Sequence, residues 1–216
     1  MDNYKRNLIV VNEEDVIIGT KKALLAHKIS DLTLHRAFSV FIFNKEGKLL
    51  VQKRAAGKLV YPGLWSNTCC SHPFINEKSF SDPITDCINH AISRVDYELG
   101  IKVNKEDFNF YNRMLYKATK EDFFYKFLGK EPKTQPFKEY KILDDINFID
   151  EDEFGEYEVD YLFTIIKDVT SLPNKSEVEE IKYVDKKELK DLIYKNEFTP
   201  WFKMILKSID LFEMIK

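Results

Sequence analysis

One amphipathic segment, between Pro83 and Gly100, constrains the fold more than any other part of the sequence. Pro83 suits the first turn of a helix, and Gly100 can end one. We therefore expect a helix here with a single apolar face packed against the core. Its apolar side chains recur at spacings of three and four, which places them on that face: Ile84, Ile88, Ala91, Ile92, Val95 and Leu99.

Short segments rich in apolar and β-branched residues lie on both sides of this helix. They predict strands at 7–12, 37–44, 48–53, 108–117, 158–166 and 181–184. A turn over 44–47 ends in Gly47 and makes a hairpin of the second and third strands. Asp185 and Glu188 form a capping box for a helix at 186–195, and an amphipathic helix follows Pro200. Strands interleaved with a few helices predict an α/β (α+β) fold, a mixed β-sheet sandwich flanked by helices.

The length of the chain fits one domain. It has 216 residues and a mass of 25.5 kDa, and apolar residues make up 44% of it. No linker rich in Pro, Gly or Ser divides it, so we expect a single domain over residues 1–216. Residues 120–149 carry aromatic residues, lysines and prolines without a clean period, which predicts an inserted excursion.

Charge and cysteine usage narrow the class of protein. Lys and Arg number 33 against 36 Asp and Glu, which argues against a general nucleic-acid binder. The longest strongly apolar run, 37–43, is far shorter than the ~18–20 residues that a membrane-spanning helix needs. The N-terminus turns acidic where a signal peptide would be apolar. Three cysteines, two of them adjacent, make a poor disulfide framework and favour a reducing compartment. We expect a soluble cytoplasmic protein with no nucleic-acid or membrane partner.

Histidines and glutamates predict a metal site. Three of the four histidines, His27, His35 and His72, lie near other suggestive residues. Glu156 and Glu158 are two apart, so on a strand their carboxylates point to the same face. Three imidazoles and two carboxylates suit an octahedral ion such as Mg²⁺ or Mn²⁺ better than a four-coordinate structural zinc site.

The sequence alone allows two interpretations for each of four other residues. Cys70 is either a buried thiol packing as a small hydrophobe or a thiol held for proton transfer or nucleophilic attack. Arg54 and Lys58 are either solvated surface charges or contacts for a diphosphate that also binds Mg²⁺. Trp201 is either core or a ring face that stabilises a developing cation.

Six short motifs occur in a fixed order along the chain. They are His35-Arg36-Ala37-Phe38-Ser39-Val40-Phe41, Tyr61-Pro62-Gly63, Asn67-Thr68-Cys69-Cys70-Ser71-His72-Pro73, Tyr97-Glu98-Leu99-Gly100, Glu156-Tyr157-Glu158 and Thr199-Pro200-Trp201-Phe202. Together they closely resemble the type I isopentenyl-diphosphate isomerases, which belong to the Nudix-fold superfamily. The resemblance extends from about Asn7 to Lys207, apart from the excursion at 120–149. It implies a Nudix-like fold.

The resemblance also implies an activity: an isomerase that interconverts isopentenyl and dimethylallyl diphosphate for isoprenoid biosynthesis. Metal-dependent protonation and deprotonation would pass through a carbocation-like transition state. Cys70 and Glu158 match the catalytic residues, Tyr116 a tyrosine beside that glutamate, and Trp201 the ring that faces the cation. The metal shell matches His27, His35, His72, Glu156 and Glu158, for Mg²⁺, Mn²⁺ or Zn²⁺.

The resemblance also implies which residues bind the diphosphate end of the substrate. Glu98 matches the residue that holds a second Mg²⁺ against the diphosphate, and Arg54 and Lys58 match its direct contacts. The family often has a lysine at position 23, where this chain has Ala23 with Lys22 beside it. We therefore expect Lys22 to take that part.

The Nudix signature is incomplete in this chain, and this bears on the competing functions. Its usual Arg-Glu and Glu-Glu pairs are Ser93-Arg94 and Tyr97-Glu98 here, so one acid remains. A Nudix hydrolase of a nucleoside diphosphate derivative is the alternative, and it would rely on several such acids. A third hypothesis is a non-catalytic metal-binding module. The partner we expect is a small isoprenoid diphosphate, and the sequence leaves open a monomer or a homodimer.

Overall fold

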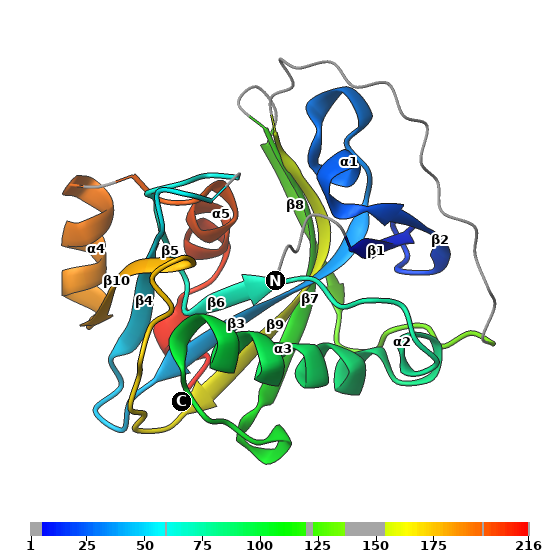
Figure 1. The fold of residues 1–216 in the computed structure, drawn as a ribbon. Coiled ribbons are helices and arrows are strands. Elements are labelled where there is room, and N and C mark those ends of the chain that lie inside the picture. Colours follow the sequence, from blue (N-terminus) through cyan, green and yellow to red (C-terminus); the bar gives the residue numbers. More distant parts are fainter. Residues whose placement is uncertain (1–5, 59, 120–122, 137–153, 196, 216) are drawn as a thin grey trace. The chain divides into compact units, whose positions relative to one another are not determined.

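The structure is a computed structural model that describes residues 6–58, 60–119, 123–136, 154–195 and 197–215 (Figure 1). The chain forms two compact units. The first comprises 1–38, 72–90 and 112–161, and the second comprises 39–71, 91–111 and 162–216. Four elements contribute residues to both units: β3 (His35–Phe43), α3 (Pro83–Leu99), β7 (Asn109–Ala118) and β9 (Glu156–Ile166).

The first unit contains the N-terminal strands. β1 (Asn7–Val11) pairs antiparallel with β2 (Ile17–Lys22), and Val10 of β1 lies opposite His35 at the start of β3. The short helix α1 (Ala23–His27) follows β2 directly. The first unit also contains the 3₁₀ turn η2 (Ile29–Asp31), the helix α2 (Lys78–Ser81) and the first part of α3. β9 lies between β3 and β7, and β7 pairs antiparallel with β8 (Phe123–Gly129). Figure 1 shows β7, β8 and β9 running side by side.

The second unit is built on β4 (Leu49–Arg54), which pairs antiparallel with β10 (Val178–Val184) and with β3. The short strands β5 (Trp65–Ser66) and β6 (Cys69–Ser71) pair with β4 and β3 respectively. The helices α4 (Lys186–Lys195) and α5 (Pro200–Ser208) follow β10, and two 3₁₀ turns, η3 (Lys105–Asp107) and η4 (Leu211–Glu213), complete this unit. Together the elements make a mixed α+β fold with a large mixed sheet and few helices, as expected.

Apolar burial explains why these segments adopt these structures. Every residue of β3 is buried, as expected for a strand with neighbours on both edges. On α3, Cys87, Ala91, Val95 and Leu99 are each fully buried and recur every four residues, so one helical face is apolar. Burying a Val or Leu side chain contributes about 1.5–3 kcal/mol, so this face holds the helix in place.

Most of the predicted elements are confirmed, with shifted ends. The helix expected from Pro83 to Gly100 is α3, and that expected at 186–195 is α4. The capping box of α4 is present, because Glu188 accepts from the Asp185 amide at 2.8 Å and Asp185 accepts from the Glu188 amide at 2.8 Å. The turn before β4 has Gly47 at φ +75°, in the left-handed region that glycine adopts without strain.

The structure describes only part of the excursion predicted at 120–149. Phe123–Gly129 forms β8, a regular strand paired with β7 from Arg113 to Ala118. The run of apolar residues there lacks the strict alternation that predicts a half-buried strand, so the sequence pattern concealed it. Residues 137–149 lie outside the described part of the chain. Among the described residues, no helix has the length and apolar character to cross a membrane.

Candidate functional site

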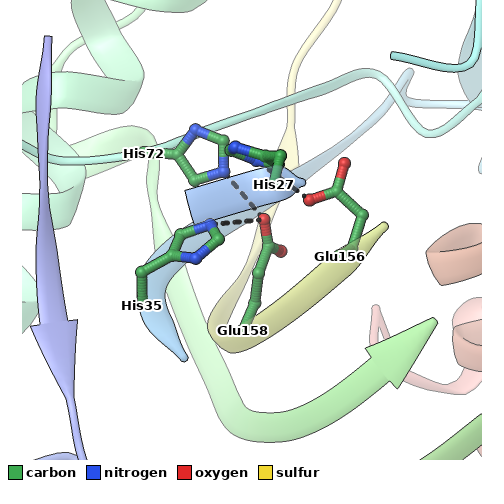
Figure 2. Close-up of side chains that lie close together, drawn as sticks. All are labelled: His27, His35, His72, Glu156 and Glu158. Carbon is green, nitrogen blue, oxygen red and sulfur yellow. Dashed lines mark hydrogen bonds and ion pairs between the residues drawn. The ribbon is translucent and has the colours of Figure 1, made fainter. Parts of the chain in front are cut away.

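Five side chains of the first unit converge on one point. His27 ends α1, His35 begins β3, His72 follows β6 in the chain, and Glu156 and Glu158 lie on β9. Each offers one ligand atom, and these atoms all lie within 4.8 Å of one another. Figure 2 shows the three imidazoles and the two carboxylates directed toward one another. The structure therefore brings together the whole metal shell that the sequence predicts.

Backbone hydrogen bonds orient two of the imidazoles. Nδ1 of His27 lies 2.6 Å from the carbonyl oxygen of Ala23, and Nδ1 of His35 lies 2.7 Å from that of Thr33. A ring nitrogen that faces a carbonyl carries the proton and donates it, so the lone pair of the neutral ring is on Nε2. In both residues Nε2 is the atom that points into the cluster, the orientation seen in histidines that bind metals.

The nitrogens and oxygens of the cluster are close together. His27 Nε2 lies 3.1 Å from Glu156 Oε2, and Glu158 Oε1 lies 2.7 Å from His72 Nε2 and 3.4 Å from His35 Nε2. The centroids of the three rings are 4.8, 4.9 and 5.0 Å apart, nearly an equilateral triangle.

Two buried atoms of the cluster indicate that a cation fits it. Within the described part of the chain, His35 Nε2 and Glu156 Oε2 have no hydrogen-bond partner. Buried polar atoms in native proteins nearly always have one, since leaving them unpaired costs about 1–3 kcal/mol each. A lone pair on nitrogen and a carboxylate oxygen are both ligands for a divalent cation, so these residues fit the expected metal.

The pKa values within the cluster diverge. Burial opposes a charge on His27, but the Glu156 carboxylate outweighs it and raises the His27 pKa to about 9. Burial lowers the pKa of His72 to about 4, and its hydrogen bond to Glu158 opposes this only in part. Burial also raises the pKa of Glu156. The pKa of Glu158 is well below its usual range despite burial, because the imidazoles of His35 and His72 lie against its carboxylate and favour the charged form. In the metal-free protein one proton therefore resides on the His27–Glu156 pair.

Tyr116 adds a further group to this cluster. Its side chain is buried on β7, and its hydroxyl donates to Oε2 of Glu158. Burial, together with the charge of Glu158, raises the Tyr116 pKa well above the ordinary value, so the hydroxyl stays protonated. The two oxygens of Glu158 thus have different surroundings: Oε1 faces His35 and His72, and Oε2 accepts from a phenol.

The second unit places Arg54 over Trp201. The guanidinium carbon of Arg54 lies 5.3 Å from the centroid of the indole, within the range of a cation–π interaction. Arg54 also donates to the carbonyls of Tyr61 at 3.1 Å and Val60 at 2.7 Å, which fixes the guanidinium. The indole Nε1–H donates to Oδ1 of Asn67 at 3.1 Å, so the ring of Trp201 is held from its edge.

The same unit holds a buried group of charges around Glu98. Arg94, one helical turn earlier on α3, forms an ion pair with it, and Nε2 of Gln52 donates to it at 3.2 Å. Burial would raise the Glu98 pKa, but Arg94 and Lys58 outweigh it and keep that pKa below its usual value. Glu177 pairs with both Lys58 and Arg94. Glu98 is therefore ionised.

Arg94 is a residue that our sequence analysis did not assign to the site. It stands where the Nudix signature has a glutamate, and its partner is the one signature acid that this chain keeps. The signal was present in the sequence, because an arginine and a glutamate four residues apart on a helix are neighbours.

Comparisons with known proteins bear on the identity of the chain. No family model matches it. It is 36% identical over 230 residues to isopentenyl-diphosphate Delta-isomerase II of Clarkia breweri, covering 96% of this chain and 70% of that protein. It is 34% identical to isopentenyl-diphosphate Delta-isomerase I of Arabidopsis thaliana, covering 96% and 68%, and 35% identical to the isomerase of Gibberella zeae, covering 95% and 74%. The chain belongs to the isopentenyl-diphosphate Delta-isomerase family.

Solved structures of low identity agree on the fold. A protein from Deinococcus radiodurans matches with a TM-score of 0.57 at 12% identity, covering 95% of this chain and all of that one. A MutT protein from Methanosarcina mazei matches with a TM-score of 0.50 at 10% identity, covering 84% and 94%. This member of the isopentenyl-diphosphate isomerase family thus has the Nudix-type fold that the sequence predicts.

The three cysteines of this family member differ in their surroundings. Cys69 and Cys87 are fully buried, and burial raises the pKa of both thiols well above the usual value, so they are unreactive. Cys70, on β6, is only half-buried.

Lys22 is the last residue of β2, immediately before α1.

Proposed function

We propose that this protein interconverts isopentenyl and dimethylallyl diphosphate by moving a carbon–carbon double bond. One carbon gains a proton and another loses one, so the transition state resembles a tertiary carbocation. The observation that carries the proposal is the position of Glu158, with one oxygen in the His/Glu cluster and the other held by the Tyr116 hydroxyl. A carboxylate bound in this way has a fixed orientation and a strongly perturbed acidity, which proton transfer to or from carbon requires.

His27, His35, His72, Glu156 and Glu158 would hold a divalent cation. Three nitrogen and two oxygen ligands favour an ion that accepts octahedral geometry, Mg²⁺ or Mn²⁺, although Zn²⁺ accepts the same donors. When bound, such a cation offsets the charge of the two carboxylates and lowers the proton affinity of Glu158. The backbone carbonyls behind His27 and His35 keep their Nε2 atoms available for it.

We assign the two proton transfers to Glu158 and Cys70. Of the three thiols, Cys70 alone is not fully buried, which makes it the one suited to exchange a proton with a ligand. Trp201 offers an electron-rich ring to the developing positive charge. Its indole N–H is bound by Asn67, so this ring is held in one orientation.

Positive side chains would bind the diphosphate. Arg54 and Lys58 supply charge in the second unit, and Lys22 takes the part of the lysine that position 23 lacks. Glu98, ionised beside Arg94, would be a ligand for the Mg²⁺ that the diphosphate carries. Guanidinium and ammonium groups bind phosphate oxygens with charge-assisted hydrogen bonds, which are about twice as strong as neutral ones.

We also propose that residues 1–216 act as one isomerase domain in the cytoplasm. Three free cysteines and the absence of any disulfide among them support a reducing compartment. The expected partner is the small isoprenoid diphosphate, and the protein would act as a monomer or a homodimer.

Substitution of the two proton-handling residues tests the proposal. Cys70→Ala and Glu158→Gln should each remove nearly all conversion of isopentenyl diphosphate while leaving the circular dichroism spectrum unchanged. Cys87→Ala is the matched control, because Cys87 is a buried thiol on α3 to which we assign no chemistry, and it should keep turnover. Full activity in either of the first two variants would refute the role of that residue.

A hydrolase of nucleoside diphosphate derivatives is the alternative, because MutT-type folds are similar. The Nudix signature positions carry Ser93, Arg94 and Tyr97 in place of the usual Arg and acids, so Glu98 is the one signature acid that remains. We expect no release of phosphate or nucleoside monophosphate from a panel of nucleotides. Hydrolysis of any of them at a rate comparable to isomerisation would restore the alternative.

A further inference from the structure

A fully buried carboxylate, Asp15, lies outside the His/Glu cluster, in the turn between β1 and β2. Asp15 has no exposed surface, and its φ of +64° is in the left-handed region, which asparagine and aspartate tolerate better than other side chains. A short polar side chain is thus held on a strained backbone with no exposed surface. Such a residue is retained where its contacts outweigh the strain.

Three strands each contribute one side chain to the Asp15 carboxylate. Arg36 of β3 donates from Nε to Oδ1 at 2.9 Å, and Arg113 of β7 donates from a terminal nitrogen to Oδ2 at 2.9 Å. The Tyr161 hydroxyl of β9 donates to Oδ2 at 2.5 Å. Burial, reinforced by Asp15, raises the Tyr161 pKa well above its usual value, so this hydroxyl remains a donor.

The same three strands carry residues of the metal cluster and its hydroxyl donor. His35 precedes Arg36 on β3, and Glu158 lies three residues before Tyr161 on β9. Because side chains alternate along a strand, each of these pairs points to opposite faces of the sheet. β9 lies between β3 and β7, and β7 carries Tyr116. The Asp15 carboxylate thus joins, from the other face, the strands on which His35, Glu158 and Tyr116 are mounted.

The two arginines extend this junction to neighbouring segments. Arg36 donates to the carbonyl of Ser79 in α2 at 2.8 Å. Arg113 donates to the carbonyls of Gly129, at the end of β8, at 3.1 Å and of Glu131 at 2.8 Å. Two guanidinium groups are therefore buried against one carboxylate, and removing its charge would leave both cations uncompensated in a dry environment.

We propose that Asp15 is a positioning residue for the His/Glu cluster. Its carboxylate fixes β3, β9 and β7 relative to one another, and so keeps His35, Glu158 and Tyr116 at the distances that a cation and a proton transfer require. This inference rests on the proposed metal binding. An error of about 1 Å in the supporting strands is enough to weaken such a site.

Asp15→Asn tests the proposal, since it keeps the shape of the side chain and removes its charge. The matched control is Asp86→Asn. Asp86 is another buried carboxylate of the first unit, bound by Ser79 and Asn76 and paired with His90, none of which lies on β3, β7 or β9. Mn²⁺ affinity is measured by calorimetry and the ligand field by the visible spectrum of the Co²⁺ form. Both are recorded at a temperature where circular dichroism shows the variants folded.

We expect Asp15→Asn to weaken Mn²⁺ binding by about 10–100-fold, the usual effect of removing a supporting contact of metal ligands, and to shift the Co²⁺ spectrum. Asp86→Asn should lose stability but keep both the affinity and the spectrum. If folded Asp15→Asn keeps the Mn²⁺ affinity and the Co²⁺ spectrum of the wild type, the inference about Asp15 is overturned, but the proposed metal site is not. Wild-type protein that binds no Mn²⁺ would overturn the proposed metal site as well.

Tyr161→Phe keeps the proposal testable if Asp15→Asn does not fold. It removes one of the donors to Asp15 and keeps the ring, so the protein should fold. We expect a smaller weakening of Mn²⁺ binding, by about 3–10-fold, since only one hydrogen bond to Asp15 is lost. An unchanged affinity and Co²⁺ spectrum in this variant would also overturn the inference.

Discussion

Binding of a divalent cation to the His/Glu cluster should release close to one proton at neutral pH. Glu156 raises the pKa of His27 to about 9, although burial opposes the charge. Nδ1 of His27 already donates to the Ala23 carbonyl, so the proton that titrates is on Nε2. Nε2 is also the atom that would bind the cation, and it can do so only after losing that proton.

The magnitude follows from this pKa. A pH of 7 is about two units below the pKa of His27, so roughly 99% of the His27 side chains are protonated. Removing that proton costs about 2.7 kcal/mol, which lowers the affinity for the cation by ~100-fold. Affinity should therefore rise about tenfold per pH unit between pH 7 and 8 and level off above pH 9. His72, with a pKa of about 4, is neutral at these pH values and releases nothing.

Calorimetry with Mn²⁺ in buffers of different ionisation enthalpy measures this proton directly. The slope of heat against buffer enthalpy should give close to one proton at pH 7. The control is Glu156→Gln, which removes the carboxylate that favours the His27 imidazolium, so its released fraction should fall well below one. A wild-type slope of zero, with an affinity that stays flat between pH 6.5 and 8.5, would refute the reasoning.

Two further predictions concern stability and are measured by urea unfolding. Gly100→Ala should destabilise the protein by more than about 1 kcal/mol, because φ is +63° and an added Cβ would lie 2.8 Å from the Leu172 carbonyl oxygen. Gly57→Ala is its control, since nothing lies within 4 Å of the added atom, and a loss equal to that of Gly100→Ala would count against this reasoning. Arg94→Gln should cost about 3–5 kcal/mol at pH 8, because the buried Glu98 carboxylate loses its partner. Without Arg94 the Glu98 pKa rises above its unfolded value, so this loss should shrink as pH falls toward 5; a loss independent of pH would contradict it.

Regular periodicity was the most reliable guide from sequence to fold. The apolar face of α3 and the capping box of α4 are local signals, and local hydrogen bonds and burial suffice to form those elements. β5 and β6 have two and three residues each, and tertiary pairing alone defines strands of that length. The apolar run in β8 carries no alternation, so its pairing with β7 was hidden from pattern analysis.

The metal cluster was predicted partly from residue chemistry and partly from the family resemblance. Strand alternation alone places Glu156 and Glu158 on one face. The meeting of His27, His35 and His72 depends on three separate elements, and no sequence spacing determines that. No sequence pattern predicts the contacts of Asp15. A single aspartate in an acidic turn is typical of a solvated residue, and the residues that bind its carboxylate are far away in the sequence.

The central claim is that this chain moves a double bond by adding and removing protons, and one NMR measurement tests it most directly. Purified protein is incubated with isopentenyl diphosphate and Mg²⁺ in deuterated buffer, after its metal content has been determined. The account predicts dimethylallyl diphosphate that carries deuterium taken from the solvent. Unchanged, unlabelled substrate in the presence of metal-loaded, folded protein would contradict it.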